Sequence, residues 1–355
     1  MSRLENLRSR LRERELDGIL ITNRENRCYL SGFTGSSGTL VIGMEEAFLV
    51  TDFRYWEQAS SESKGFELYK QGPQMWASIG ELLQKLKWER IGFEGTLTYQ
   101  EFQNFEGVLT SNASLTPVTD LVEELRRVKE DSEIELISKA AIITDTAWEK
   151  TISRIRPGVK ERDLALEFDY QLRLNGAEGN AFPTIVAFGE RAALPHAAPG
   201  GKELVSGEFV LIDGGALYQG YNADLTRTVV LGKADSEQLR IYELVLKAQL
   251  EALEYLRSGL TGREVDQKAR DIISKAGYGE NFGHGLGHSV GLNIHENPRL
   301  SPNESGQIPK GAVVTVEPGI YLPKWGGVRI EDLVEVEENG VRNLTGASKK
   351  RLLEI

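Results

Sequence analysis

Two different patterns of apolar residues follow one another along this chain, and the change between them near residue 125 constrains the fold most. In the first half, leucines at positions 4, 7, 11 and 16 have helical spacing, and the apolar run Gly18 to Ile21 follows them. Later segments alternate in the same way, with strand-like runs at 39–42, 47–51, 66–69 and 90–93 and helical stretches near 55–63, 75–88 and 99–109. This alternation predicts a small α/β domain.

The second half has a different pattern. Residues 121–129 are charged and helical in spacing, and Asp131 offers the N-cap of a new helix. From Phe182 onward, apolar strands and glycine-rich turns are interrupted by helices near 235–257 and 263–276, which predicts an α+β domain around a mainly antiparallel sheet. Because 355 residues exceed the length at which one hydrophobic core stops growing, we expect two domains, 1–125 and 126–355.

Charge and cysteine content narrow the expected partners and compartment. The chain has 42 Lys and Arg against 53 Asp and Glu, and this net charge of −11 disfavours nucleic acid and anionic membrane surfaces as partners. No apolar run approaches the roughly 18 residues that a membrane span needs, and we expect no signal peptide because the first residues lack an apolar core. The single cysteine, Cys28, suits a reducing compartment, so we expect a cytoplasmic protein.

The stretch from Glu208 to Leu231 has two apolar arms around a short polar turn, as a β-hairpin does. If Tyr218 and Gln219 form a two-residue loop, Asp213 and Asp224 lie directly opposite each other. Opposed like charges destabilise a sheet, and burial makes them costlier unless a cation lies between them. The spacing therefore predicts a metal site. The alternative is two solvated aspartates, and a bulge at Gly220 would shift the register.

Further acids and all four histidines fall in the same half. An apolar strand beginning at Ala312 ends in Glu317, and in the later segment Val-Arg-Ile-Glu, Arg329 and Glu331 share one face of a strand. The histidines are His196, His284, His288 and His295. Three glycines within 283–287 argue against a helix, and hence against a helical zinc pair. The glycine pattern also does not fit a dinucleotide-binding loop.

Taken together, these motifs have a familiar order: an aspartate pair, Gly-His-Gly-Leu-Gly-His at 283–288, Val-Glu-Pro-Gly at 316–319 and Val-Arg-Ile-Glu at 328–331. The chain resembles the pita-bread metallopeptidases, and most nearly Xaa-Pro dipeptidase (prolidase) and aminopeptidase P. Its first half resembles their creatinase-like domain at 29–35 and 51–55. The resemblance implies an α/β creatinase-like N-terminal domain followed by an α+β pita-bread catalytic domain with a mainly antiparallel sheet.

The resemblance also implies a role for each motif residue. The implied metal ligands are Asp213, which chelates one of two divalent ions, Asp224 and Glu331, which bridge both, and His288 and Glu317, which complete the second site. A water between the ions attacks the peptide carbonyl, with Glu317 as proton shuttle. The other implied residues are His196 and His284 beside the substrate, His295 at the tetrahedral intermediate, and Arg329, which contacts a bridging carboxylate and serves substrate binding.

Metals and substrate follow from the same resemblance. One imidazole and four oxygen donors favour Mn²⁺, with Co²⁺ or Zn²⁺ as alternatives. The implied substrate is a small peptide with proline in second position, whose scissile bond has no N–H. A homodimer is also implied. The sequence leaves open whether the substrate is a dipeptide or a longer peptide.

Three alternatives to an Xaa-Pro peptidase can be weighed. A metal-independent creatinase-like relative, acting as an amidinohydrolase or a non-catalytic binding protein, has the same fold, but all five ligand types are present here. A methionine aminopeptidase generally lacks a large N-terminal domain. In the third alternative the N-terminal domain is a binding module and the second half a scaffold, and the content of divalent metal would separate that protein from a metallopeptidase.

Overall fold

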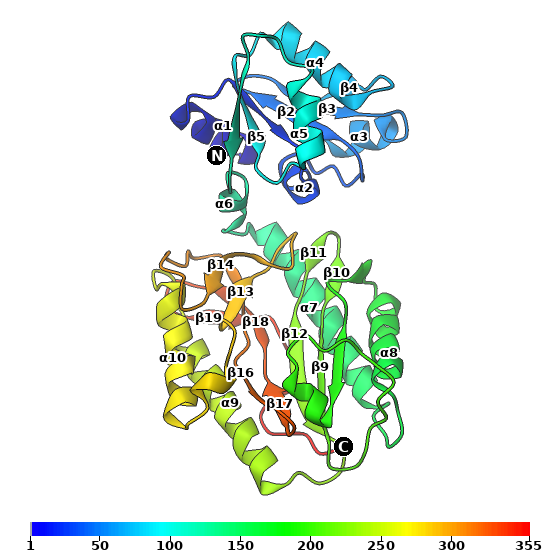
Figure 1. Ribbon diagram of the computed structural model, residues 1–355, viewed down its shortest axis with the longest axis vertical. Coiled ribbons are helices and arrows are strands. Elements are labelled where there is room, and N and C mark those ends of the chain that lie inside the picture. Colours follow the sequence, from blue (N-terminus) through cyan, green and yellow to red (C-terminus); the bar gives the residue numbers. More distant parts are fainter. Residues whose placement is uncertain (1) are drawn as a thin grey trace. The chain divides into compact units, whose positions relative to one another are not determined.

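The computed structural model describes residues 2–355. The chain divides into two compact units, one ending at Arg126 and the other running from Arg127 to Ile355. Each unit has its own helices and sheets (Figure 1). Within the described residues, no helix is both long and apolar enough to cross a membrane.

The first unit is built on one six-stranded sheet with the strand order β4-β3-β2-β1-β5-β6. Strand β1 pairs antiparallel with β2 and parallel with β5, so the sheet is mixed. The elements are α1 (Arg3–Glu13), β1 (Gly18–Ile21), α2 (Arg24–Ser31), β2 (Thr39–Gly43), β3 (Ala47–Thr51), α3 (Trp56–Glu62), β4 (Glu67–Lys70), α4 (Met75–Leu86), β5 (Arg90–Glu94), α5 (Tyr99–Glu106), β6 (Ser114–Val118) and α6 (Glu123–Arg126).

The apolar run predicted as the first strand lies at the centre of this sheet. All of β1 is buried, and Leu20 belongs to a core cluster with Val41, Ile79 and Phe105. The α/β prediction for this half is confirmed. The sequence pattern did not indicate α2 or β6. Strand β6 is an edge strand with mostly exposed residues, so its sequence carries little apolar signal.

The second unit contains four long helices and four small sheets (Figure 1). Its helices are α7 (Asp131–Ile152), α8 (Glu161–Leu174), α9 (Ser236–Tyr255) and α10 (Gly262–Lys275), with short 3₁₀ turns η1 (Gly189–Ala193) and η2 (Gly279–Asn281). Its strands are β7 (Gly179–Asn180), β8 (Ile185–Phe188), β9 (Phe209–Gly214), β10 (Ala216–Tyr218), β11 (Tyr221–Asn222), β12 (Leu225–Val230), β13 (Gly287–Ser289), β14 (Glu296–Leu300), β15 (Val313–Val316), β16 (Gly319–Leu322), β17 (Gly326–Arg329), β18 (Asp332–Val336) and β19 (Val341–Asn343).

Every strand pairing within these four sheets is antiparallel, which confirms the α+β prediction. One sheet has the order β12-β9-β8 and another β14-β13-β15-β18-β19. They are joined where Glu331 N donates to Thr226 O at 3.2 Å. One hydrophobic cluster includes Leu211 and Val230 from the first of these sheets and Val314 and Val334 from the second. The two sheets therefore share one hydrophobic core.

The predicted register of the aspartate hairpin is wrong. Tyr218 pairs with Tyr221, so the turn is Gln219–Gly220, one residue later than predicted. Both turn residues have positive φ, 46° and 81°, as a type I′ turn requires, and glycine favours that conformation. Asp213 consequently pairs with Thr226 instead of Asp224. The pairing moves by two residues, which leaves the same side chains on the same face of the sheet.

The start of the first long helix also differs from the prediction. The N-cap of α7 is Glu130, and Asp131 is the first helical residue. Glu133 explains the difference, because its carboxylate accepts a hydrogen bond from Glu130 N at 2.9 Å and so fixes the first turn. The preceding charged stretch, predicted as helical over 121–129, is helical only in α6.

A glycine pair gives a test of the packing around β13. A Cβ on Gly287 would lie 2.1 Å from Thr315 O on β15, whereas a Cβ on Gly283 would meet no described heavy atom within 4 Å beyond its chain neighbours. We predict that Gly287→Ala lowers the free energy of unfolding by about 1–3 kcal/mol because the strands must move apart. Gly283→Ala should change it by less than about 0.5 kcal/mol. Urea unfolding measures both, and equal losses would contradict this packing argument.

Candidate metal centre

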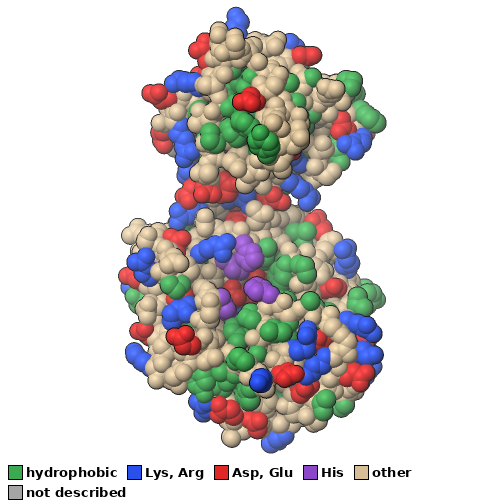
Figure 2. All heavy atoms as spheres, in the orientation of Figure 1, with side chains coloured by type: hydrophobic (Ala, Val, Ile, Leu, Met, Phe, Trp, Pro, Cys, Tyr) green, Lys and Arg blue, Asp and Glu red, His purple; other side chains and the backbone are tan. Residues whose placement is uncertain are grey.

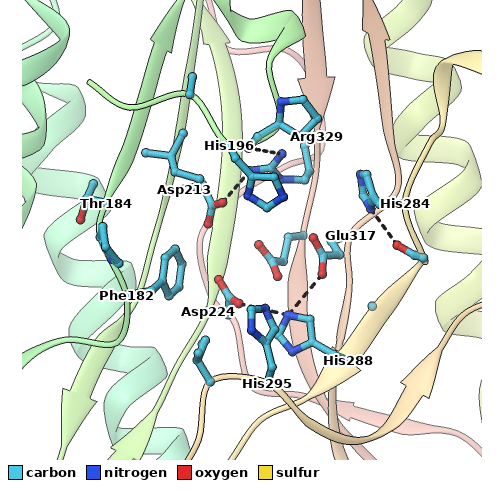
Figure 3. A pocket seen from close by; sticks show the side chains of 18 of the residues that line it. Phe182, Thr184, His196, Asp213, Asp224, His284, His288, His295, Glu317 and Arg329 are labelled. Atoms are coloured by element: carbon cyan, nitrogen blue, oxygen red, sulfur yellow. Dashed lines mark hydrogen bonds and ion pairs between the residues drawn. The ribbon is translucent and has the colours of Figure 1, made fainter. Parts of the chain in front are cut away.

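All nine site residues predicted from the sequence line one cavity of about 660 Å³ in the second unit. They are His196, Asp213, Asp224, His284, His288, His295, Glu317, Arg329 and Glu331. Figure 2 shows histidine side chains gathered around a hollow, with acidic atoms between them. Figure 3 shows the labelled carboxylates pointing toward the middle of this group, with His288 and His295 beside them.

Three buried carboxylates form the centre of the site. Asp213 lies on β9, Asp224 immediately before β12, and Glu331 between β17 and β18. Each offers an oxygen, and these oxygens lie within 4.8 Å of one another. Since the side chains come from strands of different sheets or from residues next to those strands, the cluster depends on the junction between the sheets.

Two of these carboxylates accept a hydrogen bond at one oxygen, and each of the three has one oxygen without a hydrogen-bond partner. Arg329 Nη2 donates to Asp213 Oδ2 at 2.5 Å, and Thr226 Oγ1 donates to Glu331 Oε2 at 2.6 Å. Among the described residues, Asp213 Oδ1, Asp224 Oδ1 and Glu331 Oε1 are buried without a hydrogen-bond partner. Buried carboxylate oxygens are costly without a partner, so the arrangement fits a bound cation.

His288 completes this arrangement from β13. Its Nδ1 lies 3.1 Å from Ser289 O, which can only accept a hydrogen bond, so Nδ1 carries the proton. Burial lowers the pKa of His288 to about 3, so the ring is neutral and Nε2 has a lone pair. That atom lies 3.4 Å from Glu317 Oε1 and 3.6 Å from Asp224 Oδ2. Lone pairs therefore face lone pairs, and a metal ion would relieve their repulsion.

Burial of acids close together raises the pKa values of Asp224, Glu317 and Glu331. Burial raises the pKa of Asp224, and neighbouring Glu331 and Asp213 raise it further. Burial likewise raises the pKa of Glu331 and takes that of Glu317 to about 7. A hydrogen bond from Thr315 Oγ1 to Glu317 Oε1, at 3.1 Å, acts in the opposite direction. A pKa near 7 suits a group that accepts and returns a proton at neutral pH.

Arg329 has a different partner from the one predicted. It binds Asp213, to which the resemblance gave a single metal, and not a carboxylate expected to bridge. The guanidinium is buried, and it also donates to Thr226 Oγ1 at 3.0 Å and to the Tyr321 hydroxyl at 2.8 Å. Its polar groups thus orient other side chains of the site.

Tyr321, on β16, joins this network. Its hydroxyl lies 2.9 Å from His284 Nε2, while His284 Nδ1 lies 2.7 Å from Gly285 O. Because that carbonyl only accepts, Nδ1 carries the proton and Nε2 accepts from Tyr321. Burial lowers the pKa of His284 to about 4 and raises that of Tyr321 to about 12, so both groups are neutral near pH 7.

The remaining histidines lie at the rim. His295 and His196 are exposed and line the cavity, and the His295 ring stands edge-on to His288 with 4.3 Å between ring centroids. Partial burial, with Arg299 and His196 nearby, lowers the pKa of His295. Arg299 was not predicted as a site residue. Arg299 lies opposite His288 because β13 pairs with β14, and local sequence patterns do not predict that pairing.

Comparison with known proteins identifies the family. Residues 135–338 match metallopeptidase family M24, and residues 3–128 match the creatinase/prolidase N-terminal domain. The chain belongs to metallopeptidase family M24. The prediction of a metallopeptidase with a creatinase-like domain and a pita-bread catalytic domain is confirmed. Membership in this family implies divalent metal, and the donor groups described above fit it.

Individual relatives of this metallopeptidase are similar over nearly their whole length. The Xaa-Pro dipeptidase of Pyrococcus furiosus is 42% identical over 353 residues, with 99% of each chain covered. Among solved structures, an Xaa-Pro dipeptidase from Bacillus anthracis has a TM-score of 0.96 and 42% identity, covering 99% of this chain and 98% of that one. An X-Pro aminopeptidase from Thermotoga maritima has a TM-score of 0.90 and 37% identity, with 95% and 98% covered.

The raised pKa of Glu317 predicts a pH-dependent stability in the metal-free protein. Its pKa is about 7 in the folded state against 4.5 ordinarily, so between these values the folded state holds a proton that the unfolded chain has released. The stabilisation is present below pH 4.5 and is lost as the pH rises through 7. Relative to Glu317→Gln, wild type should therefore gain about 1 kcal/mol in free energy of unfolding from pH 8 to pH 6.

Urea unfolding in the presence of a chelator measures this difference. The buried histidines oppose the trend below pH 6.5 in wild type and variant alike, so the comparison uses the difference between the two proteins. A constant difference between wild type and variant over this range would contradict the raised pKa.

Proposed function

We propose that this metallopeptidase is an exopeptidase that hydrolyses the bond between an N-terminal residue and a following proline, using two divalent cations that activate the attacking water between them. The metal part of this proposal is supported by the lone pairs of Asp213, Asp224, Glu331 and His288, which face one another without a cation. The relatives named Xaa-Pro dipeptidase and X-Pro aminopeptidase support the substrate class.

The five donor residues would divide between two ions. Asp213 would bind one, Asp224 and Glu331 would contact both, and His288 with Glu317 would complete the other. Oxygen donors outnumber the single imidazole, which favours Mn²⁺, with Co²⁺ or Zn²⁺ as alternatives. Bound cations would supply Lewis acidity at the scissile carbonyl and lower the pKa of the attacking water.

The side chains around the cations would handle the proton and the substrate. Glu317, with a pKa of about 7, would take a proton from the water and return it to the proline nitrogen, which leaves as a secondary amine. His196 and His284 line the cavity beside the substrate position, and His295 lies next to His288 where it can donate to the developing oxyanion. Arg329 would keep Asp213 oriented for metal binding.

The lining of the cavity fits a small peptide that contains proline. Apolar surface comes from Phe182, Ile185, Pro195 and Ile294. The cavity has one arginine besides Arg329, and this Arg299 is exposed and forms no hydrogen bond or ion pair with the described residues. We therefore propose that Arg299 receives the C-terminal carboxylate, so that dipeptides are preferred over longer peptides.

The proposal predicts metal-dependent cleavage. Protein stripped of metal should be inactive on an Xaa-Pro dipeptide, and Mn²⁺ should restore release of the first residue, with two ions bound per chain by mass spectrometry. A dipeptide with alanine in place of proline should be a poor substrate. A folded protein that binds no divalent metal and cleaves neither peptide would contradict the proposal.

Two substitutions sharpen this test. Glu317→Gln should lower kcat at least about 100-fold, because it removes both a ligand and the proton shuttle. Glu338→Gln is the matched control, since Glu338 is 75% exposed and lies on the surface opposite Lys310. Equal activity of the two variants would exclude Glu317 from the reaction.

A separate prediction concerns peptide length. Arg299→Met should raise KM for an Xaa-Pro dipeptide roughly 10- to 100-fold, the range expected for loss of a charged hydrogen bond. It should change KM little for the corresponding dipeptide amide, which lacks the carboxylate. Steady-state kinetics on both substrates measures the effect, and a similar loss for the two would rule out carboxylate recognition by Arg299.

We also propose a cytoplasmic homodimer, as the resemblance and the lone Cys28 suggest. Light scattering after size-exclusion chromatography tests the dimer directly. A mass equal to one chain at micromolar concentration would count against it.

A further inference from the structure

We propose that Asp266 and Arg270, one turn apart on α10, are positioning residues that hold the loop 282–286 and thereby fix the orientation of His284. The kinetic part of this inference rests on the proposed peptidase function. Its spectroscopic part, given below, does not.

The two side chains form a well-aligned ion pair. Arg270 Nε donates to Asp266 Oδ2 at 2.7 Å and Nη2 donates to Oδ1 at 3.0 Å. Asp266 is 1% exposed, and the side chain of Arg270 is 20% exposed. An ion pair on a helix surface at this spacing would ordinarily be solvated and contribute little. This pair instead faces the protein interior, which calls for another explanation.

The ion pair binds the main chain of a single short loop at three points. Arg270 donates to Phe282 O at 2.7 Å and to His284 O at 2.6 Å. Asp266 Oδ1 accepts from Leu286 N at 3.0 Å. The guanidinium also lies 4.2 Å from the centroid of the Phe282 ring, which is perpendicular to the His284 ring with 5.1 Å between the ring centroids. The main chain on both sides of Gly285 is therefore tied to α10.

The same loop reaches the metal centre from its other side. Leu286 O accepts a hydrogen bond from Glu317 N at 2.8 Å, so Leu286 connects Asp266 with the backbone of a proposed ligand. The ring of His284 meets the Tyr321 hydroxyl, which in turn accepts from Arg329. A displacement of the loop would thus move His284 away from Tyr321.

The composition of the loop makes this restraint necessary. Gly283 and Gly285 flank His284, and glycine gives the backbone a wide range of conformations. A Cβ on Gly285 would lie 2.9 Å from Leu300 O, so close approach to β14 leaves no room there for a side chain that could brace the loop. Restraint must come from outside the loop, and Asp266 and Arg270 supply it.

The first test is kinetic. Arg270→Met and Asp266→Asn should lower kcat for an Xaa-Pro dipeptide roughly 10- to 100-fold, the effect expected when an active-site group loses its position. The affinity for Mn²⁺, measured by titration calorimetry, should stay within about threefold because no ligand is touched, and Arg270→Lys should recover part of kcat. Lys275→Met is the matched control, because it breaks an exposed ion pair with Asp271 on the same helix.

The second test needs no substrate. The chain has four histidines, so nitrogen-15 labelling of histidine in the full-length, metal-free protein gives a spectrum simple enough to assign with His284→Asn. In wild type, His284 should show the single tautomer protonated at Nδ1. In Arg270→Met and Asp266→Asn its two nitrogen shifts should move toward an average of both tautomers, and in Lys275→Met they should not.

The outcomes separate this inference from the proposed function. If wild type does not cleave Xaa-Pro peptides, the function fails, and the His284 spectra still decide the positioning role. Unchanged His284 shifts in folded Arg270→Met and Asp266→Asn would overturn the inference, as would a loss of thermal stability and metal affinity with the tautomer retained. If Arg270→Met does not fold, Asp266→Asn and Arg270→Lys carry the same comparison.

Discussion

Lone pairs that face one another inside the cavity are the constraint on which the second unit depends. Segments of different sheets bring Asp213, Asp224, Glu331 and His288 together, and the oxygens of the three acids lie within 4.8 Å of one another. Burial and mutual repulsion then raise the pKa values of Asp224 and Glu331, which shows how unfavourable their charged forms are without a counter-ion. Under the proposed function, these buried positions are polar because they would bind a cation.

Hydrogen bonds from the protein satisfy this cluster only in part, and the choice of oxygen matters. Arg329 binds one oxygen of Asp213, Thr226 one of Glu331 and Thr315 one of Glu317. In Asp213 and Glu331 the other oxygen stays buried without a partner, whereas in Glu317 the bonded oxygen is the one nearest to His288 Nε2. The guanidinium cancels one of the four carboxylate charges, so the remaining three do not balance two dications. The complete centre would therefore favour a bound anion such as hydroxide.

Local patterns in the sequence predict the residues that could donate to a metal, but they do not predict the contacts between helices and strands. The two-residue period of a strand places Asp213 and Asp224 on one face even though the predicted register is wrong, because a shift of two preserves the face. The turn forms at Gln219–Gly220 because Gly220 readily adopts positive φ. The hydrogen bonds from Arg329 to Asp213 and from Tyr321 to His284 join residues distant in sequence, and no periodicity encodes them.

The glycines around His284 and His288 explain why part of the site must be supported from a distance. Gly287 and Gly285 let the segment lie against backbone carbonyls of Thr315 and Leu300, at separations that exclude any Cβ. That closeness brings both histidines into the cavity, yet it removes the side chains that would normally stiffen such a segment. His288 regains rigidity from strand pairing in β13, whereas His284 lies before the strand begins. The neighbouring helix α10 is a rigid element, and its buried ion pair binds main-chain atoms of this segment without filling the cavity.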